Sequence, residues 1–243
     1  MKTPLALLLA GAAALAAPLA HANPSFSVSA YSEYEFRGLG QTAHRPAAQA
    51  TAGYSHESGF YAGAFASNIR WLKELANASG FSSSADIEID LFGGYKFEPA
   101  KGVTVDVGYL RYEYPSSGGF NPKPNTNELY GSVAYGPVTV KYSRAFSDAF
   151  GVANSKGSDF IEANLALPVA DKITMTAQIG HQTFKNNGPL SYTVFKVGAT
   201  YDLGGGWTAG GYLKDTNADS ALYTVNGKDW GAARVVAFAT YAF

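Results

Sequence analysis

The chain has 243 residues, of which 47% are hydrophobic and only 15% are charged. Charged residues make up about a quarter of an average soluble domain, so this composition is unusual for a soluble α/β enzyme. The absence of cysteine excludes disulfides, thiol catalysis and cysteine-based zinc sites, and a formal net charge of −1 gives no argument for nucleic-acid binding.

The first segment, residues 1–22, has the features of a cleaved secretory signal peptide. Lys2 provides a positive start, residues 5–20 form an apolar run, and Ala20-His21-Ala22 matches the small-x-small cleavage site. No cysteine follows this site, which excludes a lipoprotein anchor. We therefore expect a signal peptide at 1–22 and a mature domain at 23–243.

Beyond residue 22 the dominant pattern is alternation of apolar and polar residues. The clearest example is DIEIDLFGGYKF at 86–97, in which Ile87 and Ile89 share one face with Leu91, while Glu88 and Asp90 occupy the other. A period of two places successive side chains on opposite faces of a β-strand. This segment is longer than the five or six residues of a typical globular strand.

Twelve segments of this kind follow one another along the chain. They lie at 26–37, 46–55, 60–71, 86–97, 103–114, 128–136, 138–146, 159–167, 173–184, 191–202, 207–215 and 232–243. No segment after residue 22 shows the spacing of an amphipathic helix, and none reaches the roughly 20 apolar residues that a transmembrane helix needs. The expected fold class is all-β.

The connections between these segments alternate in length. Short turns at 56–59, 98–102 and 136–137 alternate with long connections at 72–85, 115–127 and 147–158, and the pattern continues to the end. Transmembrane barrels have short periplasmic turns and long outer loops, and closure leaves no unpaired strand edge in lipid. The sequence therefore predicts a transmembrane antiparallel up-and-down β-barrel of about 12 strands.

The last segment, AARVVAFATYAF, ends in an aromatic residue. Tyr241 and Phe243 lie on the same face of this strand. A terminal aromatic on an alternating strand is a feature that bacterial outer-membrane barrels share, and the barrel assembly machinery is thought to recognise it. We therefore expect an integral protein of the outer membrane of a Gram-negative bacterium, with membrane lipid and the assembly machinery as partners.

The start of the mature chain carries a specific motif, SEYEFRGLGQT. It is followed by ESGFY at 57–61 and by ASN at 66–68. These residues resemble the TorF-type porin family, also called Gcw_chp, although Gly40 stands where serine is more usual. The resemblance implies a pore-like barrel and indicates no particular substrate. The motif positions are Tyr34, Phe36, Arg37, Gly38 and Gln41.

Other interpretations of single motifs fail on their context. Residues 38–43 match G-x-G-x-x-A, but an alternating segment follows where a dinucleotide site needs a helix. The spacing of Asp86, Glu88 and Asp90 on one strand is too wide for all three to share a cation. None of the three histidines of the mature chain stands in a nucleophile motif. We expect no enzymatic activity, no cofactor and no metal.

The polar face of the strands carries charges that we expect to line the lumen. Acids lie mainly on the fourth to sixth and eighth strands, and bases on the tenth to twelfth and the first. The predicted lining residues are Glu33, Glu35, Arg37, Asp86, Glu88, Asp90, Asp106, Glu128, Lys141, Glu162, Lys196, Lys214 and Arg234. On the same pattern, Tyr34 and Phe36 are expected to face lipid.

The opposed acids and bases allow two interpretations. A water-filled lumen with a transverse field would act as a porin-like channel for passive diffusion of small hydrophilic solutes or ions. Alternatively, the same residues pair as salt bridges and plug the barrel, since twelve strands lie between filled eight-stranded barrels and open porins. A closed barrel would instead use its long extracellular loops to bind a partner or surface ligand. No pattern specifies the solute or the oligomeric state.

Overall fold

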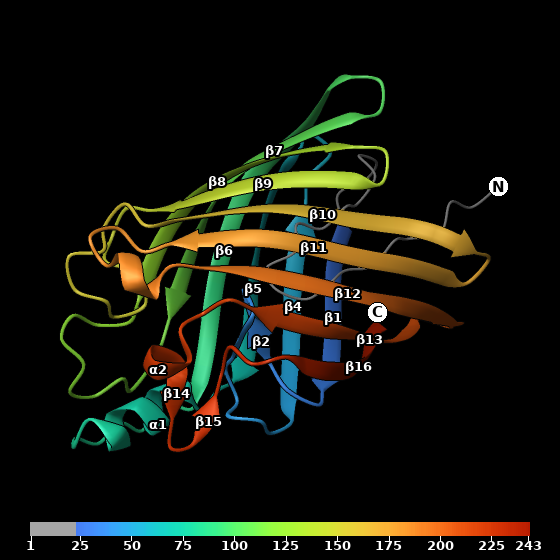
Figure 1. Cartoon of the computed structure of the whole chain (residues 1–243). Coiled ribbons are helices and arrows are strands. Elements are labelled where there is room, and N and C mark those ends of the chain that lie inside the picture. The colour runs from blue at the N-terminus through green and yellow to red at the C-terminus, as the bar shows by residue number, and fades with distance from the viewer. Residues whose placement is uncertain (1–22) are drawn as a thin grey trace.

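The computed structural model describes residues 23–243, so the predicted signal peptide lies outside the described residues. Residues 23–243 contain a closed barrel of twelve antiparallel strands (Figure 1). The barrel strands are β1 (Asn23–Tyr31), β4 (Ala47–Ser55), β5 (Phe60–Asn68), β6 (Ile87–Ala100), β7 (Val103–Glu113), β8 (Thr126–Tyr135), β9 (Val138–Ala145), β10 (Asp159–Ala170), β11 (Ile173–Thr183), β12 (Tyr192–Gly204), β13 (Trp207–Thr216) and β16 (Arg234–Ala242). The predicted fold class and strand number are confirmed.

Barrel strands that follow one another in the chain pair side by side, and the first pairs with the last. Tyr31 lies opposite Ala47 on β4 and opposite Phe238 on β16. The turns at 56–59, 101–102, 136–137, 171–172 and 205–206 join the strands at one end, which we call the short-turn end. The long connections gather at the other end, the loop end (Figure 1). This matches the predicted alternation of connection lengths.

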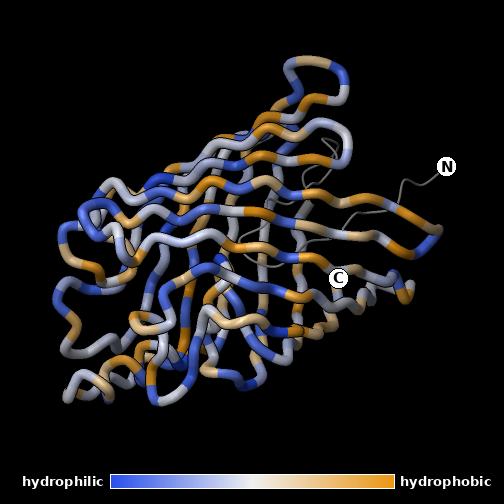
Figure 2. The backbone as a smooth tube through the Cα atoms, viewed as in Figure 1, coloured by the Kyte–Doolittle hydropathy of each residue, from blue (hydrophilic) through white to orange (hydrophobic). Residues whose placement is uncertain are grey.

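The outer wall of the barrel is apolar. Leu129, Val133 and Val235 are 58%, 50% and 75% exposed and alternate with inward-facing neighbours. Figure 2 shows this alternation of apolar and polar residues along the strands. An exposed apolar wall of this extent is the surface that a barrel presents to lipid.

Inside the wall, several aromatic rings lie over a glycine of the neighbouring strand. A Cβ atom added at each of these glycines would come within 2.4–2.6 Å of an atom of that aromatic side chain. Glycine at these positions lets the ring lie against the wall instead of projecting across the bore. The pairs are Phe92 over Gly63, Tyr61 over Gly94, Tyr130 over Gly108, Phe160 over Gly180 and Phe238 over Gly210.

The loop end contains short helices that the sequence pattern does not predict. These are α1 (Trp71–Ala78), the single-turn η1 (Gly188–Leu190) and α2 (Ser220–Tyr223). In α1 the side chains of Trp71, Leu72 and Ala76 are buried, although 60–71 was expected to be strand. The two turns of α1 contain too few repeats for the 3.6-residue period to be recognised in the sequence. Among residues 23–243, no helix is both long and apolar enough to cross a membrane.

A hairpin held between two charged walls as the candidate functional site

The chain leaves the barrel wall after Tyr31, and residues 32–46 fold into the lumen as what we call the plug hairpin. Two short strands, β2 (Glu35–Phe36) and β3 (Leu39–Gly40), pair antiparallel within it. The predicted first strand, 26–37, is therefore too long at its outer end. The backbone N–H of Ser32 donates to the carbonyl of Ala237 on β16 at 2.8 Å, which fixes the point of departure.

The prediction that Tyr34 and Phe36 face lipid is wrong. Tyr34 is only 4% exposed, and the Phe36 ring packs edge-on against Tyr112 and Phe150, each at 5.5 Å between centroids. Alternation gives the relative facing of residues along an extended segment. It does not show whether that segment stays in the wall or bends inward, so the apolar face of this stretch contacts the inner core instead of lipid.

The tip of the plug hairpin is a tight turn pressed against the barrel wall. Arg37 and Gly38 both have positive φ, 48° and 88°, which matches a type I′ connection between β2 and β3. A Cβ at Gly38 would lie 2.7 Å from Val194 Cγ2 and 2.6 Å from Thr216 Cγ2. Glycine is required here by both the backbone conformation and the close approach.

Arg37 reaches the acidic wall. Its guanidinium donates from Nη1 to Glu128 Oε1 at 3.0 Å and from Nη2 to Glu128 Oε2 at 2.7 Å, and Nη1 also donates to Gln182 Oε1 at 2.9 Å. The Phe160 ring covers the guanidinium carbon at 4.6 Å. Both partners of this ion pair are buried, with side chains 8% and 3% exposed. Arg37 is thus locked to a carboxylate across the lumen.

The two carboxylates of the plug hairpin reach the opposite wall. Glu35 Oε2 lies 2.5 Å from Lys196 Nζ on β12, and Glu33 Oε2 lies 2.7 Å from Arg234 Nε on β16. Lys214 on β13 donates from Nζ to the carbonyl of Gly38 at 2.9 Å and is completely buried. We call Lys196, Lys214 and Arg234 the basic arc.

The acidic arc consists of Glu88 and Asp90 on β6 and Glu128 on β8. Tyr34 donates its hydroxyl to Glu88 Oε1 at 2.6 Å. Glu88 and Asp90 are 1% and 4% exposed, and within residues 23–243 neither forms an ion pair. In the order of strands around the barrel, β6 and β8 lie opposite β12 and β16. The plug hairpin therefore presents acids to the basic arc and a base to the acidic arc.

Asp86 does not line the lumen as predicted. Its side chain is 67% exposed at the rim and lies 3.0 Å from Lys73 on α1. It precedes β6 by one residue, so the alternation that runs through the strand has already ended where Asp86 stands.

The remaining predicted lining residues are Asp106 near the short-turn end of β7, Lys141 in the middle of β9 and Glu162 near the loop end of β10. Asp106 is 2% exposed and accepts a hydrogen bond from Tyr61 at 2.6 Å, and Glu162 accepts one from Gln178 at 2.6 Å. The Nζ atom of Lys141 lies 4.0 Å from the centre of the Tyr130 ring. Asp106 and Glu162 thus accept hydrogen bonds from side chains of the wall.

Three further residues singled out by the sequence are Gln41 of the family motif and the terminal aromatics Tyr241 and Phe243. Gln41 accepts at its carbonyl from the backbone N–H of Arg70 at 2.8 Å and of Trp71 at 3.0 Å, so it ties the plug hairpin to the start of α1. Tyr241 and Phe243 pack edge-on at 4.8 Å, and Phe243 is 74% exposed at the short-turn end.

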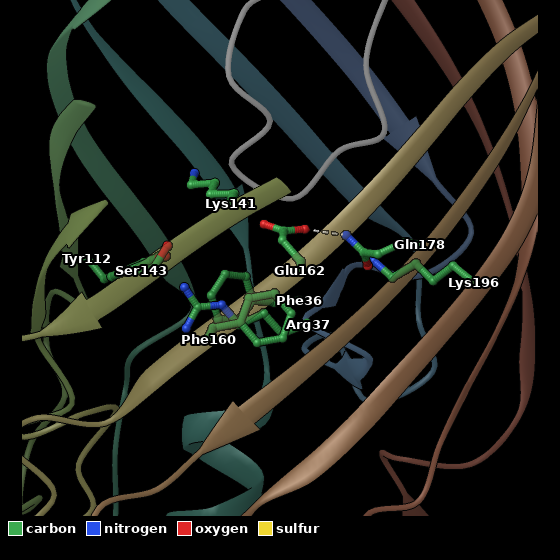
Figure 3. A pocket seen from close by; sticks show the side chains of 9 residues that line it. All are labelled: Phe36, Arg37, Tyr112, Lys141, Ser143, Phe160, Glu162, Gln178 and Lys196. Carbon is green, nitrogen blue, oxygen red and sulfur yellow. Dashed lines mark hydrogen bonds between the residues drawn. The ribbon is translucent and has the colours of Figure 1, made fainter. Parts of the chain in front are cut away.

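A small cavity lies beneath the hairpin tip (Figure 3). Phe36 and Arg37 of the hairpin line it together with wall residues, among them Lys141, Glu162 and Gln178. It offers about 20 Å³ to water, which is room for about one molecule. This cavity is too small for a solute. Alternation along the strands predicts the inward charges of both arcs but not the segment that bridges them.

Comparison with solved structures places the barrel in a known class. The KdgM porin matches with a TM-score of 0.58 at 9% identity, covering 90% of this chain and 99% of that one. A structure described as KdgM porin in complex with disordered oligogalacturonate matches with the same score at 10% identity and the same coverage. The NanC porin matches with a TM-score of 0.60 at 12% identity, covering 89% of this chain and 98% of that one. The fold is that of the outer-membrane porins.

The family model described as "Bacterial protein of unknown function (Gcw_chp)" matches residues 16–243. The chain belongs to this family, which confirms the resemblance seen in the motif around Arg37. Among curated proteins, no relative matches significantly.

Proposed function

We propose that this protein is an outer-membrane channel for small hydrophilic solutes or ions, closed at rest by the plug hairpin. One observation carries the proposal: the barrel wall is complete without the hairpin. β1 pairs directly with both β4 and β16, so the hairpin contributes no strand to the wall. Displacing residues 32–46 would leave all twelve barrel strands paired.

The chemistry of the hairpin contacts supports a removable plug. Its strongest links to the wall are ion pairs, through Arg37, Glu35 and Glu33. Buried ion pairs add little net stability, because the cost of removing both charges from water offsets most of their attraction. Once the hairpin moves, the acidic and basic arcs face each other across water and create a transverse field that selects ions and orients polar solutes.

The remaining parts of the proposal concern the route to the membrane. The predicted signal peptide at 1–22 supports export, and the exposed apolar wall supports insertion into lipid. Phe243 supports recognition by the barrel assembly machinery. The porin fold of the structural neighbours supports a transport role, while the ligand named for KdgM belongs to that protein.

A second candidate is a closed barrel whose outer loops bind a partner. The packed loop end favours it: Asn226 in the connection between β14 (Thr224–Val225) and β15 (Lys228–Asp229) donates to Glu74 on α1 at 2.6 Å. In that case the plug hairpin would be a permanent filling that braces the loops, and its removal would open no route for ions.

Planar bilayer recording separates the two candidates. The test variant replaces residues 33–42 with a glycine-serine chain of equal length, and a matched control replaces the mostly exposed residues 185–189 in the same way. We expect rare conductance from the wild type and the control, and steady discrete steps from the test variant. A silent test variant that retains the β-rich circular dichroism spectrum of the wild type would overturn the channel and favour the closed barrel.

A further inference from the structure

We infer that the basic arc is a binding site for carboxylate-bearing solutes, and that Glu33 and Glu35 occupy it as internal ligands while the channel is closed. The inference rests on the proposed function, because a solute reaches the arc only when the plug hairpin leaves. The solute class is small molecules with two carboxylates, which would reproduce the contacts that the hairpin makes.

The three cations form a continuous row. Lys196 lies directly opposite Lys214 in the pairing of β12 and β13, and Lys214 lies directly opposite Arg234 in the pairing of β13 and β16. Directly opposed side chains on neighbouring strands are about 5 Å apart at Cβ, and like charges placed this way repel. Anions in contact with the row offset this repulsion.

The counterions for this row come from the hairpin and not from the wall beside it. Asp202 is the single acid at the inward-facing positions of β12, β13 and β16, and it lies near the short-turn end, exposed. Glu35 contacts Lys196 at 2.5 Å, and Glu33 contacts Arg234 at 2.7 Å. When the hairpin leaves, the row loses both carboxylates together.

The cations of the basic arc are ordered by contacts with their surroundings. Lys196 and Lys214 are 8% and 0% exposed with the plug hairpin in place, and Lys214 also donates from Nζ to the carbonyl of Trp230 outside the hairpin at 2.9 Å. The Tyr212 ring lies 5.6 Å from Lys196 Nζ and supports it from below. Groups that are already ordered lose little entropy when they bind a ligand.

The spacing of the internal ligands defines the class of solute. Glu33 lies in the bend that follows β1 and Glu35 begins β2, so the two carboxylates leave the chain two residues apart. Flexible side chains bring their carboxylates to cations on β12 and β16, on either side of β13. A short dicarboxylate such as glutarate can span the same row, whereas its diamide, glutaramide, has the same shape without the charge.

Calorimetric titration in detergent tests the inference without relying on conductance. With the barrel whose residues 33–42 are replaced, we expect saturable binding of glutarate and none of glutaramide. Lys196→Gln and Arg234→Gln should each weaken binding about tenfold or more. Lys101→Gln, an exposed lysine in the turn between β6 and β7, should change nothing. The wild type should bind at least tenfold more weakly, because its own carboxylates fill the site.

Two results would overturn the inference. Equal heats with glutarate and glutaramide would show that the row does not select carboxylates. Tight glutarate binding that survives Lys196→Gln and Arg234→Gln together would place the ligand elsewhere. If the replaced barrel fails to fold, the full-length variant E33Q/E35Q/R37M, which keeps the hairpin but removes its charges, takes its place. A barrel that binds glutarate yet passes no current would contradict only the proposed channel.

Discussion

The two halves of the lumen are built from the same alternating strands but differ in what fills them. Toward the loop end the inward side chains are buried by the plug hairpin, and Glu88 and Lys214 are 1% and 0% exposed. Toward the short-turn end the wall presents small hydroxyl side chains such as Ser25, Thr104 and Thr174, which remain partly exposed. The strand period determines which side chains face inward. Whether they meet water or protein depends on a segment outside the strands.

Electrostatics differ between the halves in the same way. In the half toward the loop end, which we call the filled half, charges of the wall pair with charges of the plug hairpin across the lumen. In the half toward the short-turn end, Asp106 instead accepts a hydrogen bond from Tyr61 of its own wall. Only the first arrangement depends on the plug hairpin, so the two halves should respond differently to substitution.

The largest effect is expected from Arg37→Met, which removes the link between the plug hairpin and the acidic arc. Glu128 would be left buried without its cation, beside Glu88 and Asp90, at a cost of about 3–5 kcal/mol. This cost opposes docking of the hairpin, so the ratio of open to closed channel should rise more than a hundredfold. Single-channel recording measures the ratio directly.

The matched control for this variant is Arg45→Met, because Arg45 is an exposed arginine of the same hairpin. It should leave the open fraction unchanged. Equal open fractions for Arg37→Met and the wild type would mean that the filled half does not depend on this ion pair, and the contrast between the halves would lose its electrostatic basis.

The wall of the barrel could be predicted from sequence, because each strand carries its own repeated signal. Val133 and Val235 face outward and Glu128 faces inward as alternation requires. The plug hairpin could not be predicted in this way, because Tyr34 and Phe36 alternate with charged residues just as lipid-facing residues do. The pair Arg37-Gly38 indicates a tight turn, but it does not indicate whether the turn lies outside the barrel or folds into the lumen. The pairing of Arg37 with Glu128 joins residues 91 positions apart, and no local pattern specifies it.

A smaller effect is expected from Gly94→Ala in the half toward the short-turn end. The added Cβ would lie 2.6 Å from the carbonyl oxygen of Val107 and 2.5 Å from the hydroxyl of Tyr61, so backbone and ring must both shift. Overpacking of this kind costs about 1–3 kcal/mol. We expect a lower unfolding temperature in detergent with an unchanged open fraction, since the hairpin is not involved.

Gly188→Ala is the comparison for this substitution, because a Cβ there meets nothing within 4 Å. Its unfolding temperature should match that of the wild type. A rise in open fraction for Gly94→Ala would show that the two halves are mechanically coupled and would weaken the distinction between them.

The smallest effect concerns the contact that covers the filled half at the loop end. A hydrogen bond from Asn226, together with the charge of Lys228 at 3.4 Å, lowers the pKa of Glu74. A carboxyl with a lowered pKa stabilises the contact fully above its ordinary pKa of about 4.3, and that stability is lost as pH falls through the lowered value. An ion pair near the surface contributes less than about 1 kcal/mol, so only the loop contact should loosen.

Tryptophan emission measures this loosening. In a Trp207→Phe background, which leaves Trp71 and Trp230 as reporters near the contact, the emission should shift to the red below about pH 4.3. Glu74→Gln should abolish the shift, because the amide keeps the shape but has no proton to gain. A shift that persists in Glu74→Gln would assign the loosening to another acid and leave the loop end without a pH-sensitive contact at α1.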